Sequence, residues 1–151
     1  MGIEKDIQQT NFKSELHKAH LNILYTASWL NQKTTQSLKA YKISPQQFNI
    51  LRILRGRHPE PASIKLLTER MLDKMSNASR LVDKLKAKGL VERLECPDDR
   101  RRVDVNITEK GLKLLEKASE AVEQGIIDFG TALEEPDAKQ LNNYLDKMRE
   151  E

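Results

Sequence analysis

Short polar and cationic side chains gather between Ser76 and Arg102, and their types suit the recognition of phosphates and nucleic-acid bases. They are Ser76, Asn77, Ser79, Arg80 and Lys84, followed further along by Arg100, Arg101 and Arg102. A guanidinium can pair with guanine through two hydrogen bonds, an amide can do the same with adenine, and a hydroxyl bonds bases or phosphates. The sequence therefore predicts a surface for double-stranded DNA in the middle of the chain.

The first five of these side chains fall on one predicted amphipathic helix. Its inward face follows from apolar residues at helical spacing, namely Ala78, Leu81, Val82 and Leu85. The opposite face is centred on Ser76, Arg80 and Asp83. We predict Asp73 as the N-cap of this helix and Gly89 as its end. In isolation such a face is also typical of a simple solvated helix, so the interpretation rests on the elements around it.

A basic hairpin follows this helix immediately. Residues 90–96 and 101–107 alternate apolar with polar side chains, and Pro97, Asp98 and Asp99 separate them. Arginines just past such a turn can enter an A·T-rich minor groove of strongly negative potential. We expect Asp99 to hold one arginine in a fork-like ion pair while another reaches the DNA. No further ligand pattern accompanies the two acids, so we expect no metal site.

The order of these elements predicts the fold class: mainly α with a small β-hairpin wing, a winged helix-turn-helix with N- and C-terminal dimerisation helices. We treat residues 1–151 as a single domain. The winged-helix lobe spans residues 42–107, and the dimerisation helices span 10–41 and 108–150. Helix starts are predicted from capping residues and from a proline at the first helical turn, at Ser44, Ser63, Thr108 and Pro136.

The two flanking helical regions carry long apolar stripes. The first stripe comprises Phe12, Leu16, Ala19, Ile23, Ala27 and Leu30. The second comprises Leu112, Leu115, Ala118, Val122, Ile126, Phe129 and Leu133, and the last helix adds Leu141, Leu145 and Met148. A single small domain cannot bury all of this surface, so the stripes indicate pairing with a second copy of the chain.

Charge and composition narrow the function classes. Lys and Arg outnumber Asp and Glu by 14 to 8 over residues 50–102, whereas the acids outnumber the bases by 12 to 6 over residues 103–151. No apolar run is long enough for a membrane span, and the N-terminus lacks the apolar core of a secretion signal, so we expect a cytoplasmic protein. No phosphate loop, nucleophile elbow or paired acid and base motif occurs, so we expect neither an enzyme nor a cofactor.

Four segments together resemble the multiple-antibiotic-resistance regulator (MarR) family of bacterial transcription factors. They are residues 79–85 (SRLVDKL), 88–93 (KGLVER), 99–101 (DRR, with the Asp-x-Arg spacing of the family) and 107–111 (ITEKG). The similarity in helix order covers nearly the whole chain. Leu72 and Asp73 stand in the turn where a glycine is common in the family.

This resemblance implies a homodimer joined through the first and the last two helices, which binds an inverted-repeat operator. It implies that Asp99 and Arg101 form the supporting pair of the wing, with Arg100 or Arg102 in the minor groove. It also implies a repressor that releases its promoter when a small aromatic or phenolic effector binds between the dimer helices and the DNA-binding lobe.

The candidate effector pocket lies on the first helix. Its residues are His17, His20, Tyr25 and Trp29. For Trp29 a core or dimer contact is the alternative, and for the two histidines a solvated or interface role is favoured over metal binding.

Two alternatives stay open. Some relatives sense peroxide through a cysteine near the first helix, but Cys96 falls in the predicted hairpin, beside acids that disfavour a thiolate and without a resolving cysteine. A winged helix can also serve as an adaptor that binds protein or RNA without operator specificity. Preference for an inverted repeat and strong salt dependence would distinguish DNA reading from that role.

Overall fold

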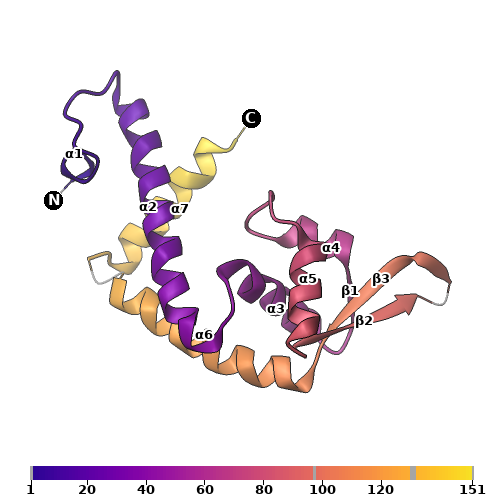
Figure 1. Ribbon diagram of the computed structural model, residues 1–151. Helices are drawn as coiled ribbons and strands as arrows, with labels where there is room; N and C mark the ends of the chain where they lie inside the picture. Colours follow the sequence, from indigo (N-terminus) through magenta and orange to yellow (C-terminus); the bar gives the residue numbers. More distant parts are fainter. Residues whose placement is uncertain (1, 97, 130–131, 151) are drawn as a thin grey trace.

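The computed structural model describes residues 2–96, 98–129 and 132–150, and it shows a winged-helix lobe joined to an arm of long helices (Figure 1). The arm contains α2 (Glu15–Leu38), α6 (Glu109–Phe129) and α7 (Glu135–Met148). The lobe contains α3 (Pro45–Arg57), α4 (Ile64–Arg70), α5 (Ala78–Ala87) and a small sheet. This arrangement confirms the predicted mainly helical fold class.

Three helix starts, two in the lobe and one in the arm, follow the capping residues seen in the sequence. Ser44 accepts a hydrogen bond from the backbone N–H of Gln47 (3.1 Å), and the Gln47 side chain accepts one from the backbone N–H of Ser44 (3.0 Å). Ser63 caps α4 by accepting the backbone N–H of Leu66 (3.1 Å), and Thr108 caps α6 by accepting that of Gly111 (3.1 Å). Each cap satisfies an N–H group that the helix itself leaves unpaired, which stabilises the helix at that residue. The three helix starts predicted at these residues are confirmed.

The sheet has one strand more than the predicted hairpin. Strand β2 (Val91–Cys96) pairs antiparallel with β3 (Asp99–Ile107), and the short β1 (Ala62–Ser63) pairs with the other edge of β3, giving the order β1-β3-β2. Pairing begins with Val91 opposite Ile107 and shifts register between Glu95 and Cys96. We call the hairpin of β2 and β3 the wing. Through β1, the sheet connects the start of α4 to the base of the wing.

The hydrophobic core lies inside the lobe and extends along α6 as far as Val122. Its fully buried members include Leu38, Ile50, Leu51, Leu54, Leu67, Val82, Leu85, Val105 and Leu115. They come from α2, α3, α4, α5, β3 and α6, so the core joins α2 and α6 of the arm to the lobe. At about 1.5 to 3 kcal/mol for each fully buried large apolar side chain, this cluster is the main stabilising term of the fold.

The N-terminal region differs from the single helix predicted over residues 10–41. Helix α2 begins at Glu15, with Ser14 as its N-cap, and continues as a 3-10 turn over Lys39–Tyr41. Before it, the short α1 (Ile3–Asp6) is tied back to α2 by an ion pair between Glu4 and Lys18. The hydrogen bond of that pair lowers the pKa of the Glu4 carboxyl and raises the pKa of Lys18. Phe12 therefore lies ahead of α2, where its ring meets His17 edge-on with centroids 6.3 Å apart.

None of the helices in the described ranges combines the length and the hydropathy needed to cross a bilayer.

Candidate nucleic-acid interface

Helix α5, which we call the reading helix, presents a polar face to solvent. Ala78, Val82 and Leu85 are buried against the core, and Leu81 is half-buried. On the other side Arg80, Asp83 and Lys84 are exposed, while Ser76 and Ser79 are half-buried beside them. The inward and outward faces are confirmed, since helical periodicity fixes both once the helix exists.

The start of the reading helix was predicted wrongly. Asn77, not Asp73, is the N-cap, and its Oδ1 accepts the backbone N–H of Arg80 at 3.1 Å. Asp73 instead accepts the backbone N–H of Met75 at 3.0 Å and stabilises a turn. Aspartate is favoured both as a helix N-cap and in tight turns, and in this structure the carboxylate of Asp73 is used by the turn. The Oδ1 of Asn77 is therefore engaged by the helix, which leaves its amide NH₂ to face a ligand.

A cleft of about 350 Å³ opens beside the N-terminal end of the reading helix. Its lining consists of Gln46, Ser76, Asn77, Arg80, Leu81 and Lys84. The structure thus brings together four of the predicted DNA-contacting residues. Gln46 comes from the first turn of α3 and was not predicted. The sequence shows only that Gln46 lies in the first turn of a helix capped by Ser44. That this turn lies beside the start of α5 depends on how the two helices pack, which a local sequence pattern does not reveal.

The wing carries its arginines on β3, but its ion pairing differs from the prediction. Asp99 accepts the backbone N–H of Arg101 at 2.9 Å and makes no side-chain ion pair among the residues with described side chains. Arg102 pairs with Asp104 instead, with 3.1 Å between Nε and Oδ1. Arg101 is exposed. The side chains of Arg100 and Cys96 lie outside the described part of the structure, so the expectations for both stay predictions.

A second ion pair links the wing to the reading helix. The Nη1 of Arg93, on β2, lies 2.7 Å from Oδ1 of Asp83. Asp83 shares the exposed face of α5 with Arg80, one helical turn away. Arg93 therefore neutralises the one acidic side chain on the face that carries Arg80 and Lys84, a contact that sequence spacing did not reveal.

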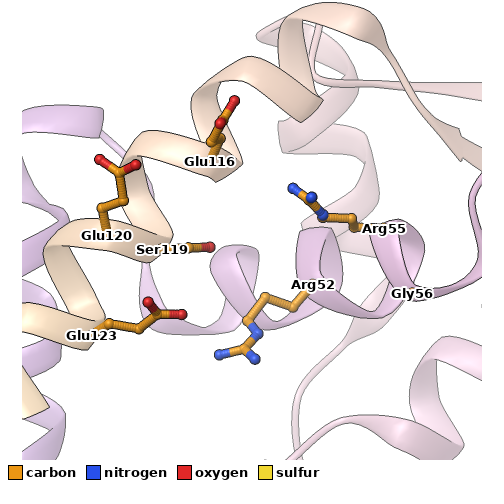
Figure 2. Close-up of a pocket in the computed structure, with 7 residues that line it drawn as sticks. All are labelled: Arg52, Arg55, Gly56, Glu116, Ser119, Glu120 and Glu123. Atoms are coloured by element: carbon orange, nitrogen blue, oxygen red, sulfur yellow. The ribbon is translucent and has the colours of Figure 1, made fainter.

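A larger cleft, of about 420 Å³, separates α3 from α6 (Figure 2). It is lined by Arg52, Arg55, Gly56, Glu116, Ser119, Glu120 and Glu123. The two arginines project from α3 toward the α6 side, and Ser119 and Glu123 point into the space between the helices. The guanidinium of Arg52 also lies 5.8 Å from the ring centroid of Phe48. The cleft therefore lies between the lobe and the arm. Arginines line its α3 side, and glutamates line its α6 side.

The four residues of the candidate effector pocket line neither cleft. His17 is half-buried against Phe12, and His20 is exposed. Tyr25 and Trp29 are 38% and 37% exposed on the surface of α2, where Lys33 lies over the Trp29 ring at 5.6 Å. In one protomer they form no common pocket, because residues 3, 5 and 4 apart on a straight helix do not share one concave surface.

A helix-turn-helix followed directly by a basic hairpin defines a winged helix-turn-helix protein. Comparison with known proteins is consistent with this: a sequence model described as MarR family matches residues 41–102. A MarR transcription factor from Planctomyces limnophilus is 31% identical, with a TM-score of 0.69, over 91% of this chain and 98% of that one. The chain belongs to the MarR family of transcription factors.

Other similarities are more distant. A mutant form of Escherichia coli MarR, solved with operator DNA, has the same fold at a TM-score of 0.80 and 21% identity, over 93% of this chain and 100% of that one. The uncharacterised HTH-type transcriptional regulator YkoM of Bacillus subtilis (strain 168) is 27% identical over 88 residues. That alignment covers 58% of this chain and spans only 56% of the length of YkoM.

Proposed function

We propose that the protein is a homodimeric, sequence-specific regulator of transcription that represses promoters by binding an inverted-repeat operator. The observation that carries this proposal is the cleft at the start of the reading helix, where Asn77, Arg80 and Lys84 converge beside a wing with exposed Arg101. The guanidinium of Arg80 can pair bidentately with guanine in the major groove, the amide NH₂ of Asn77 can donate to a base or phosphate oxygen, and wing cations suit the minor groove. Such a protein acts where its promoters are, in the cytoplasm, and needs neither cofactor nor catalytic step.

Selection of bound sites from random duplex DNA tests this function. The selected sites should contain an inverted repeat with half-sites about one helical turn apart. Affinity should fall steeply with salt, because bound cations displace counterions from the phosphates. An adaptor for protein or RNA would enrich no duplex sequence, and that result would refute the proposal.

We further propose that the effector binds in the α3–α6 cleft, which lies between the DNA-binding lobe and the dimer arm. Its volume of about 420 Å³ is within the range of small-molecule sites. Arg52 and Arg55 would bind the carboxylate or phenolate of an aromatic acid, and Ser119 offers a hydroxyl to a second polar group. A ligand there would favour one spacing of α3 from α6 and so bias the orientation of the lobe.

A thermal-shift screen of phenolic acids, followed by operator-release assays, tests the effector site. We expect Arg55→Ala to retain operator affinity and to lose the response to any acid that shifts the parent protein. Tyr25→Ala is the comparison for the site expected from sequence. Loss of the response in Tyr25→Ala but not in Arg55→Ala would move the site to the surface of α2.

A further inference from the structure

The turn between α4 and α5 exposes two large apolar side chains. Leu72 and Met75 are 90% and 93% exposed, more than any other large apolar side chain in the described part of the chain. In Figure 1 this turn is the loop that projects beyond the N-terminal end of α5. Two large apolar side chains exposed this fully on one short turn are available for contact with another molecule.

This turn is held in one conformation by hydrogen bonds. The backbone N–H of Leu72 donates to Oδ1 of Asn49 on α3 (2.9 Å), and that of Met75 donates to Oδ1 of Asp73 (3.0 Å). The backbone N–H of Ser76 donates to the carbonyl of Asp73 (3.2 Å), and Lys74 donates to the carbonyl of Glu69. The entropy of ordering the turn is therefore lost before any partner binds, as is typical of a preorganised contact surface.

The position of Met75 favours DNA as the molecule that covers it. Met75 precedes the Asn77 cap by two residues, and the intervening Ser76 lines the cleft of the reading helix. A reading helix enters the major groove with its N-terminal residues foremost, so a side chain just ahead of the cap reaches the base edges first. Residues 69–84 carry four basic and three acidic side chains, and Arg93 pairs with the acidic Asp83, so this segment has a small excess of positive charge, which suits a polyanion.

We propose that Met75 is a specificity-determining residue that contacts the 5-methyl group of a thymine in the major groove. That methyl is the apolar group that base pairs display on this edge, and an unbranched thioether side chain adapts well to it. This inference rests on the proposed DNA-binding function. It adds an apolar contact to the polar readout by Arg80 and assigns a role to the exposed turn.

Replacing thymine by deoxyuridine, one position at a time in one half-site of a selected operator, tests the contact. For the parent protein we expect one position at which uracil weakens binding about fourfold, the effect of removing one buried methyl group. Met75→Ala should bind the thymine and uracil operators equally. Met75→Leu, which keeps an apolar side chain of similar size, should restore the preference.

Leu72→Ala is the matched control, because Leu72 is equally exposed on the same turn but lies further from the reading helix. We expect this variant to keep the preference for thymine. The proposal is overturned if uracil has no effect on the parent, if the preference survives in Met75→Ala, or if both alanine variants lose it equally. Absence of binding to any duplex would instead refute the proposed function, so the two failures are distinguishable.

Discussion

At the scale of single residues, the exposed face of the reading helix carries two kinds of cation, one suited to distinguishing bases and one suited to phosphates. Arg80 lines the cleft at the start of α5 and has a planar guanidinium with paired donors. Lys84 lies one turn further along and carries a single ammonium. These two chemistries lead to different consequences when each side chain is removed.

Arg80→Ala should relax base preference, costing about 1 to 3 kcal/mol at one operator position because a bidentate pair with guanine is lost. Lys84→Ala should weaken binding to all sequences alike and reduce the slope of log affinity against log salt by about 1. Fluorescence anisotropy with an operator panel at several salt concentrations measures both effects. If the two variants lose affinity in the same pattern, Arg80 does not read bases.

The Asp83–Arg93 pair should matter for DNA affinity more than for stability. Ion pairs this exposed stabilise a fold by about 0 to 1 kcal/mol. Arg93→Ala, however, leaves the Asp83 carboxylate unneutralised on the face that we propose binds DNA, so binding should weaken at low salt and recover in the double variant with Asp83→Asn. Affinities of the four proteins form a double-mutant cycle, and additive effects would show that Arg93 acts independently of Asp83.

The least predictable part of the site was the set of contacts made by two aspartates, Asp73 and Asp99, each of which lies in a turn. Sequence indicated Asp73 as a helix cap and Asp99 as the partner of an arginine. In the structure each accepts the backbone N–H two residues further on. Aspartate favours caps, ion pairs and such turns alike, and the local backbone decides among them. By contrast, helical periodicity alone was sufficient to predict which face of α5 exposes Arg80.

At the scale of elements, the sequence predicted what local interactions determine and missed what depends on distant partners. Ser44, Ser63 and Thr108 were predictable caps because each bonds an N–H three residues away. Strand β1 was missed, since two residues have no detectable alternation and Ala62 finds its partner at Val105. The cleft between α3 and α6 was also missed, because its two walls come from segments that lie far apart in the sequence.

The junction of the wing with α6 should tolerate no side chain at Gly111. A Cβ there would meet the backbone carbonyl oxygen of Leu90, and Cγ1 of Ile107 at 2.8 Å. Because a backbone group cannot move aside, we expect Gly111→Ala to lower the free energy of unfolding by about 3 kcal/mol or more. Chemical denaturation measures this change.

Gly56→Ala is the matched control for that substitution. Nothing lies within 4 Å of a Cβ added at this position in α3, and alanine is the better helix former. We expect it to raise the stability by about 0.5 to 1 kcal/mol. Equal losses in both variants would contradict the steric explanation.

At the scale of the whole molecule, a single protomer leaves much of its arm uncovered. On α6 the stripe is buried at Leu115 and Ala118, but it continues to Ile126, which is 61% exposed. Leu16 of α2 and Met148 of α7 are also exposed. The lobe buries its own core, so the exposed apolar surface of the arm is where a second copy is expected to pack.

Ile126→Glu should separate the dimer. A carboxylate at an apolar interface loses its hydration without gaining a partner, so the dimer should dissociate at least about 30-fold more readily, the factor that corresponds to about 2 kcal/mol. Ile126→Leu, which keeps the apolar surface, should remain dimeric. Sedimentation equilibrium measures both variants, and a dimer of unchanged stability in Ile126→Glu would place the interface elsewhere.

Binding stoichiometry on a selected duplex tests the central claim most directly, namely that two protomers read one operator together. Sedimentation velocity of the complex should show two protein chains per duplex. Insertion of about half a helical turn between the half-sites should abolish this complex, because the two reading helices then face opposite sides of the DNA. One chain per duplex, bound with equal affinity at either spacing, would contradict the claim.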